Sequence, residues 1–175
     1  MKLEKYSFGM GDRFAREGKA QLQAVIKAAS EGINVVPVWN KSHREHTITG
    51  TVPKDVRVEA DAAVAALGWT KSHYVDADHI GLGNVDLFVD SCDFFTLDVA
   101  DAIGRPASEE EIEAFVGKYS QYSGKLRIPG ISGDVDVTVD AIRAIAAKFL
   151  GAVHEAAAIY RRIEAAKGKD NFVIE

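Results

Sequence analysis

Acidic and basic side chains follow several short apolar runs of this 175-residue sequence, each at the point where a run ends. The sharpest group is Asp76-Ala-Asp-His79, in which Asp76 and Asp78 stand two residues apart. In an extended strand two such residues share a face, and His79 at the strand end can turn toward the same side. A neutral imidazole is a common metal ligand, and a neighbouring carboxylate can act as a base or orient the ring. An ion pair or a helix-capping aspartate gives the same pattern, so spacing alone leaves both interpretations open.

Two other groups carry cations that suit an anionic ligand. Gly9-Met-Gly-Asp-Arg13 allows close approach of the backbone, and Arg13 can contact a carboxylate through two nitrogens. A structural turn with an Arg–Asp pair is the alternative, and the missing third glycine excludes the dinucleotide-binding fingerprint. Lys41-Ser-His-Arg-Glu45 offers Lys41 and Arg44 as a clamp for a carboxylate or phosphate, although a charged loop segment is usually only solvated.

The remaining ionisable residues divide into strand-end candidates and structural residues. Asp98 and Asp101 close a later apolar run, and Glu175 stands on the run after it. Cys92 lies among apolar residues and is expected in the core rather than as a nucleophile. We expect structural roles for two histidines and leave a third undecided; they are His73 and His154, and His46 respectively.

Apolar runs of strand length alternate with helical patterns and would position these side chains. We expect strands over residues 6–8, 33–39, 72–78, 93–98 and 171–175. We expect helices over residues 19–30, up to 67–68, over 85–91, after Ser108 with its capping partner Glu111, and over 139–166. Residues 40–53 are expected to form a polar loop. Pro37 argues mildly against the second strand, because proline has no backbone N–H to donate to a neighbouring strand.

This alternation predicts an α/β fold with a parallel sheet. Active sites of such folds form at the carboxyl ends of the strands, where the polar groups fall. We expect a single α/β domain over residues 1–175, the N-terminal portion of a larger barrel: a partial TIM-type (β/α) barrel of four to five βα units. A small open parallel α/β sheet is the alternative.

Composition narrows the class of protein. The chain is 47% hydrophobic and 27% charged, with a net charge of −5 and no basic cluster, which argues against nucleic acid and anionic membranes as partners. No apolar run has membrane-spanning length and no signal-peptide pattern is present, and the single cysteine fits a reducing compartment. We therefore expect a cytoplasmic protein.

Four of these segments together resemble the tagaturonate epimerase family, which interconverts tagaturonate and fructuronate in hexuronate breakdown. They are Ser7-Phe-Gly-Met-Gly-Asp-Arg13, Arg44-Glu45 with Thr49-Gly50, Asp76-Ala-Asp-His79 and Phe95-Thr-Leu-Asp98. They occur in the order of the family, and the resemblance covers the chain to about residue 102. It implies an isomerase in which Asp78 is the catalytic base and His79 binds a divalent metal cation.

The resemblance also implies that further metal ligands and the proton donor come from later strands, beyond most of this sequence. The isolated chain is therefore expected to be inactive or incomplete. Its expected macromolecular partner is a second copy of itself or a missing C-terminal half. We expect a sugar acid as substrate, with inversion at a carbinol carbon by retro-aldol cleavage and aldol re-addition. Substrate contacts are expected from Asp12, Arg13, Lys41, Arg44, Asp76 and Asp98, with Glu175 as a further candidate.

Other functions fit the same strand-end groups. One is a different metal-dependent aldolase or isomerase acting on a sugar or sugar phosphate. Another is a non-catalytic half-barrel that persists by pairing through its cut sheet edge. Metal binding separates an enzyme from a remnant, and a panel of substrates separates the two kinds of enzyme.

Overall fold

The structure is a computed structural model that describes Met1 and residues 3–175. The chain forms two compact units, an α/β unit of residues 1–98 and 158–175 and a second unit of residues 99–157 that lies between them in the sequence. The elements of the α/β unit are β1 (Ser7–Gly11), α1 (Gly18–Ser30), β2 (Val36–Ser42), α2 (His43–Thr49), α3 (Pro53–Leu67), β3 (Tyr74–Ile80), the short 3-10 helix η1 (Val85–Leu87), β4 (Phe94–Leu97) and β7 (Val173–Ile174).

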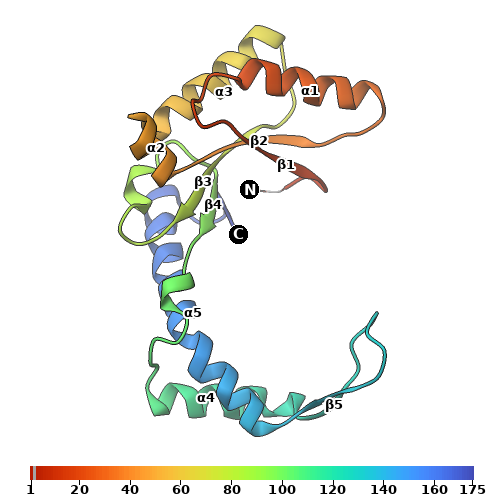
Figure 1. The fold of residues 1–175 in the computed structure, drawn as a ribbon, viewed down its shortest axis with the longest axis vertical. Helices are drawn as coiled ribbons and strands as arrows, with labels where there is room; N and C mark the ends of the chain where they lie inside the picture. The colour runs from red at the N-terminus through yellow and green to blue at the C-terminus, as the bar shows by residue number, and fades with distance from the viewer. Residues whose placement is uncertain (2) are drawn as a thin grey trace. The chain divides into compact units, whose positions relative to one another are not determined.

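The centre of the α/β unit is a five-stranded sheet in the order β1-β2-β3-β4-β7, in which every pair of neighbours is parallel (Figure 1). Strand order therefore follows chain order, without the reversal of a doubly wound sheet. The α/β class and the parallel sheet are confirmed, and the open five-stranded sheet agrees with our alternative. Closure into a partial barrel stays a prediction.

Helices α1 and α3 pack against each other and against β2 on one face of the sheet, called the helix face (Figure 1). The chain turns into and out of these helices at residues suited to it. Pro53 begins α3, where its missing N–H costs no hydrogen bond, and Gly68 ends it in the left-handed conformation. Buried side chains of α1 and α3, such as Leu22 and Ala60, then close the core against this face.

The opposite face of the sheet, called the second face, carries its own apolar cluster. Val36, Val38, Tyr74 and Phe94 are buried together, with Val173 of β7 packed on them. Because side chains alternate along a strand, residues two positions further on lie on this same face, nearer the carboxyl ends. The second face thus changes from apolar to polar along the strands.

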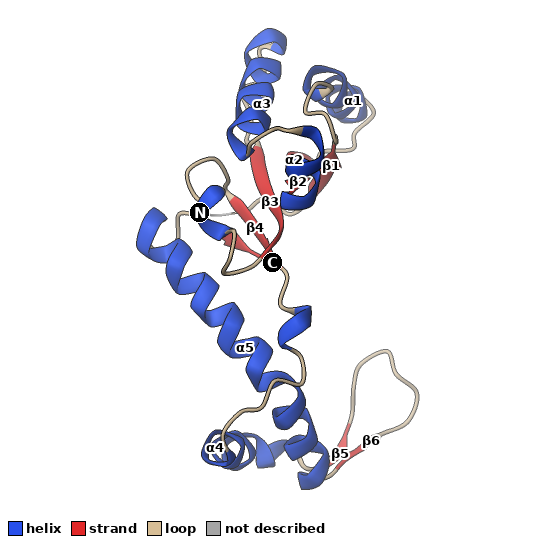
Figure 2. Ribbon diagram, turned by 60° about the vertical axis from the view of Figure 1, so that its left-hand side comes forward, coloured by secondary structure: helices blue, strands red, loops and turns tan. Residues whose placement is uncertain are grey.

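The second unit contains η2 (Ala100–Ala102), α4 (Glu109–Tyr119), η3 (Ser120–Tyr122), the antiparallel strands β5 (Gly124–Leu126) and β6 (Val135–Val137), and the first part of α5 (Val139–Lys167) (Figure 2). The predicted capping box is present, since Ser108 accepts the N–H of Glu111 and the Glu111 carboxylate returns to Ser108. Ile112 and Val116 of α4 pack against Ile142 of α5 and form the core of this unit.

Several predicted elements need correction. The polar loop expected over residues 40–53 is wrong, because β2 continues to Ser42 and α2 follows at once with its own capping box. The helix expected over residues 85–91 is only the 3-10 helix η1 followed by turns. The hairpin of β5 and β6 was not expected. In the part of the chain that the structure describes, every helix is too short or too polar to cross a membrane.

Candidate active site at the strand ends

A polar cleft of about 490 Å³ opens at the carboxyl ends of β2, β3 and β4. The cleft is lined by Ser42, His43, Arg44, Glu45, Asp78, His79, Asn84 and Asp98. Four of the predicted site residues, from three different strand ends, therefore meet in one place. The parallel register explains the meeting, since Ser42 of β2 pairs with Asp78 of β3 and the strands end at the same edge.

Asp78 and His79 form the most distinctive contact in this cleft, which we call the strand-end cleft. The register between β3 and β4 shifts after Ala77, and His79 adopts a left-handed backbone with φ of 55°. Left-handed φ is uncommon for a residue with a Cβ and marks a locally constrained position. The kink turns the imidazole outward, where it is 65% exposed, and its Nδ1 lies 2.6 Å from Asp78 Oδ1.

This contact fixes which imidazole nitrogen is available. The Asp78 carboxylate accepts a hydrogen, so Nδ1 of a neutral His79 carries the proton and Nε2 keeps its lone pair. A histidine oriented by a carboxylate in this way is the usual form of a metal ligand. This contact uses Oδ1 of Asp78 and leaves Oδ2 as a second acceptor oxygen.

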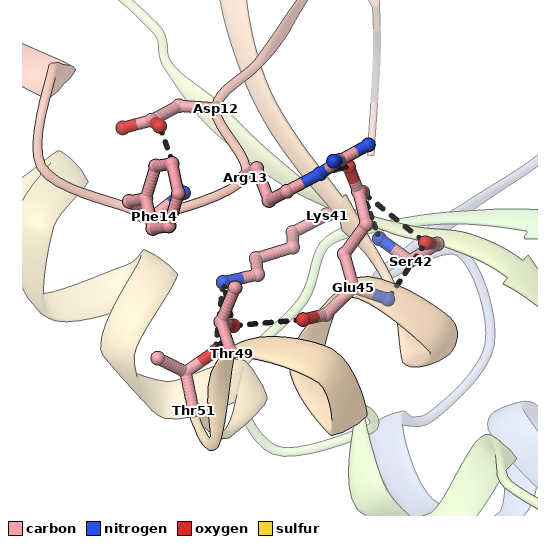
Figure 3. Close-up of polar contacts among 8 residues, drawn as sticks. All are labelled: Asp12, Arg13, Phe14, Lys41, Ser42, Glu45, Thr49 and Thr51. Atoms are coloured by element: carbon pink, nitrogen blue, oxygen red, sulfur yellow. Dashed lines mark hydrogen bonds and ion pairs between the residues drawn. The ribbon is translucent and has the colours of Figure 1, made fainter.

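Helix α2 positions the basic wall of the cleft. Ser42 and Glu45 cap its start reciprocally, because Ser42 Oγ accepts the N–H of Glu45 while the Glu45 carboxylate accepts from Ser42 (Figure 3). Gly50 ends the helix in the left-handed conformation. Arg13, on the loop after β1, reaches this cap with its Nε 3.5 Å from Glu45 Oε1. Arg13 and Arg44 are therefore the cations placed near the strand ends of β1 and β2.

A second acidic group lies on the second face of the sheet. Asn40 and Asp76 are register partners there, and Gly11 leaves room for the Asn40 amide because a Cβ would stand 3.1 Å from it. Thr96 Oγ1 lies 3.1 and 3.0 Å from the two oxygens of Asp76 and 3.0 Å from Glu175 Oε1. Burial raises the pKa of Asp76 to about 6, and the hydroxyl of Thr96 only partly offsets this.

Lys41 faces away from the strand-end cleft. It follows Pro37 and Trp39 at two-residue spacing, on the helix face, and its side chain is 1% exposed. Its Nζ donates to Thr49 Oγ1 at 2.9 Å and to Thr51 Oγ1 at 2.7 Å (Figure 3). In this structure the ammonium group binds the two threonines where α2 ends and the chain leads into α3. We had expected it to contact a substrate.

Asp12 organises the turn that leads into α1. Its carboxylate accepts the backbone N–H groups of Phe14, Arg16 and Glu17, at 2.5 to 2.9 Å. These bonds hold the pKa of Asp12 below its usual value against the opposing effect of burial. Asp12 thus fixes the loop that carries Arg13, and it is not among the residues that line the strand-end cleft.

The other residues singled out in the sequence are structural. His73 pairs with Asp61, and His154 pairs with Glu111 within the second unit; none of these four residues is among those that line the strand-end cleft. His46 is buried beside Thr51, and its desolvation lowers its pKa to about 4. Cys92 is 2% exposed, as expected for a core residue, and burial raises the pKa of its thiol to about 12.

The described residues do not form a complete metal site. Over residues 1 and 3–175 no group of three His, Cys, Asp or Glu side chains converges as a metal shell would. His79 Nε2 is one accessible nitrogen, and Asp78 is bonded to the other side of the same ring.

Ser42, His43, Asn84 and Thr96 belong to these clusters, and the sequence analysis did not select them. Ser42 with Glu45 has the spacing of a capping box, a signal that was available in the sequence. Asn84 accepts the N–H of Gly81 and closes the turn after β3. Nothing in the spacing of Asn84 or Thr96 distinguishes them from ordinary loop and strand residues.

Comparison with known proteins agrees with the fold. A family model described as tagaturonate epimerase matches residues 1–172. The structure resembles two glycerol-complexed crystal structures of the fructuronate-tagaturonate epimerase UxaE from Cohnella laeviribosi, with TM-scores of 0.72 and 0.73 at 21% and 20% identity. These matches cover 97% and 99% of this chain but only 36% and 38% of those proteins.

The native crystal structure of the same enzyme matches with a TM-score of 0.65 at 20% identity, over 97% of this chain and 36% of that one. A search of curated proteins finds no match. The chain thus spans little more than a third of the length of the solved structures that it resembles. Since the family model extends over nearly all of its residues, the chain belongs to the tagaturonate epimerase family.

Proposed function

We propose that this chain contributes the strand-end cleft to an epimerase that interconverts tagaturonate and fructuronate. Family membership supports the reaction class. The observation that carries the assignment to this cleft is the meeting of Asp78 and His79 with Arg44 at the ends of β2 and β3. The cleft is polar and holds groups of both signs, as a sugar acid with many hydroxyl groups requires.

The chemistry that we propose for Asp78 is proton transfer at a hydroxyl. The two ketouronates differ at a carbinol carbon one position beyond the carbon next to the ketone, so its C–H is not acidic. Asp78 would take the proton of its hydroxyl while the adjacent C–C bond breaks. The O–H electrons then form an aldehyde, and the electrons of the C–C bond remain on the ketone fragment as an enediolate. Rotation of the aldehyde and re-addition return the proton from Asp78 and invert the centre.

The charged residues near the cleft would orient the substrate in this scheme. Arg44 lines the cleft and Arg13 reaches the Glu45 cap beside it. A guanidinium can bind a carboxylate through two parallel hydrogen bonds, which fixes direction as well as charge. We assign the substrate carboxylate to this side and its reacting hydroxyl to the side of Asp78.

We further propose that His79 Nε2 is one ligand of a divalent cation whose other ligands lie outside these 175 residues. A divalent cation would supply Lewis-acid stabilisation of negative charge on the substrate oxygens. Binding of Mn²⁺ to the ¹⁵N-labelled chain tests this assignment without activity. We expect line broadening centred on the strand-end cleft, lost in His79→Ala and kept in His73→Ala, which removes a histidine paired with Asp61 instead. Broadening that persists in His79→Ala contradicts the assignment.

We also propose that the sheet continues into further strands, as in a (β/α) barrel. Strand order equals chain order and all neighbours are parallel, which is the arrangement that a barrel extends. The added strands would come from additional polypeptide or from a second copy of the chain. Light scattering over a range of chain concentrations distinguishes a monomer from a self-associated form.

Conversion of tagaturonate, followed by NMR with divalent cations present, tests the proposed reaction. We expect fructuronate to form and the rate to fall at least about 100-fold in Asp78→Asn, the usual scale for loss of a general base. Asp61→Asn is the matched control, because Asp61 also contacts a histidine but lies away from the cleft. A folded chain without any conversion contradicts activity of this chain by itself. Faster turnover of a sugar phosphate would favour the other class of enzyme.

A further inference from the structure

The contact between Asp76, Thr96 and Glu175 has too few hydrogen atoms if both carboxyl groups are ionised. Thr96 Oγ1 lies within hydrogen-bond distance of both Asp76 oxygens and of Glu175 Oε1. A hydroxyl has one hydrogen and can donate it to one acceptor at a time. The second carboxylate would then place an acceptor oxygen against the lone pairs of Thr96, which is repulsive.

One added proton removes this conflict. If Asp76 is protonated, its O–H donates to Thr96 Oγ1 and the Thr96 hydroxyl donates to Glu175. All three groups then have a donor and an acceptor in the right order. The arrangement joins a buried group to an accessible one, because Asp76 is 5% exposed whereas Glu175 is exposed.

We propose that Asp76, Thr96 and Glu175 form a proton relay that holds one proton between two carboxyl groups on the second face of the sheet. In a transfer step Asp76 gives its proton to Thr96 Oγ1 while Thr96 gives its own to Glu175 Oε1. Asp76 becomes a carboxylate, Glu175 becomes a carboxylic acid, and Thr96 is unchanged. The relay thus presents at Glu175 a proton that is stored at Asp76.

The surroundings of Asp76 favour retention of this proton. Burial is the largest influence, and Asp78 on its own strand and Glu175 directly after β7 add negative charge; together they raise the pKa of Asp76 to about 6. Burial, with a smaller contribution from the charge of Asp76, raises the pKa of the Cys92 thiol to about 12, so Cys92 stays neutral and adds no charge.

The inference deepens the proposed function by adding a proton-holding pair beside Asp78. Asp76 and Asp78 stand two residues apart on one strand, so their backbones are separated by roughly 7 Å. In the proposed reaction the relay would hold a proton near the site without touching the substrate, whereas Asp78 would contact the substrate. Its chemistry is present without substrate and can be tested in its absence.

Carbon-detected NMR of the full 175-residue chain, labelled at its Asp and Glu carboxyl carbons, tests the relay. We expect the Asp76 carboxyl to titrate near pH 6. In Glu175→Gln the midpoint of Asp76 should shift down, because a like charge is removed. Thr96→Val removes the hydroxyl that links the two carboxyl groups, so in this background Glu175→Gln should shift the Asp76 midpoint less than it does in the wild-type chain. Thr96→Ser should restore the full shift.

The control is Glu110→Gln, which removes an exposed carboxylate of the second unit and should leave Asp76 unchanged. The proposal is overturned if Asp76 titrates near its ordinary value of 3.8 in the wild-type chain. It is also overturned if Glu175→Gln leaves the midpoint where it was. Because the readout needs no turnover, loss of the epimerase assignment and loss of the relay are separate results.

Discussion

Replacement of Lys41 by methionine tests whether this residue is structural. The side chain is 1% exposed, and the methionine would keep its length while removing both hydrogen bonds to Thr49 and Thr51. Burial lowers the pKa of Lys41, opposed by the charges of Glu45, Asp12 and Asp55, so the ammonium is held by its surroundings at a desolvation cost.

The magnitude follows from what is lost and what is kept. Two hydrogen bonds to a charged donor are worth roughly 3–6 kcal/mol together. Part is recovered, because methionine has no charge to desolvate. The two threonine hydroxyls also still bond to each other at 2.9 Å, and Thr49 Oγ1 still donates to Glu45 O at 2.7 Å. We expect Lys41→Met to lose about 2 kcal/mol of unfolding free energy. Lys41→Ala should lose roughly 2 kcal/mol more, because it also leaves a cavity.

Urea unfolding followed by tryptophan fluorescence measures this loss in the α/β unit, since Trp39 is buried on the same strand as Lys41. The matched control is Lys54→Met, which replaces an exposed lysine and should change the unfolding free energy by less than about 0.5 kcal/mol. The reasoning is refuted if Lys41→Met unfolds like the wild-type chain but loses affinity for tagaturonate. Lys41 would then act on the substrate.

Two further substitutions test burial elsewhere. The pKa of His46 is about 4 in the folded chain, against an ordinary value of 6.5. The stability that comes from burying the neutral ring is therefore fully present above pH 6.5 and is lost as the pH falls toward 4. Between pH 7 and 4.5 the free energy of unfolding, measured with urea, should fall by about 2–3 kcal/mol less in His46→Gln than in the wild-type chain. Asp76, whose raised pKa acts with the opposite sign, is present in both chains. Gly151→Ala would place a Cβ 2.7 Å from Arg105 O and should destabilise the second unit by roughly 1–3 kcal/mol in helical circular dichroism melts, although alanine is the better helix former. A stabilised Gly151→Ala variant, or equal acid slopes for His46→Gln and the wild-type chain, would contradict these packing arguments.

The sequence was informative where local rules decide the structure. The runs at residues 33–39, 72–78 and 93–98 predicted β2, β3 and β4, because β-branched and aromatic residues on buried strands leave few alternatives. Ser108 with Glu111 predicted the start of α4 for an equally local reason. The meeting of Asp78 with Asp98 followed from the parallel arrangement alone.

The failures came from strand length and from tertiary contacts. We ended the second strand at residue 39 and assigned Lys41 to a loop. We therefore did not use its two-residue spacing from Trp39 and Pro37, which puts all three side chains on one face of the strand. Extending the strand to Ser42 places Lys41 on the helix face, where only the fold of α2 and α3 supplies its acceptors. The contact of Thr96 with two carboxyl groups joins β3, β4 and the residue after β7, and local spacing does not indicate it.

The measurement that tests the central claim most directly is a titration of the ¹⁵N-labelled chain with tagaturonate. The account predicts saturable shifts confined to residues 42–45, 78–84 and 98, with no shift at Thr49 or Thr51 around buried Lys41. Arg44→Ala should weaken these shifts. A second cleft of about 780 Å³ near Pro53 and Arg57 gives the contrast. Shifts centred there, or no shifts with the chain folded, would contradict the strand-end cleft as the sugar-acid site.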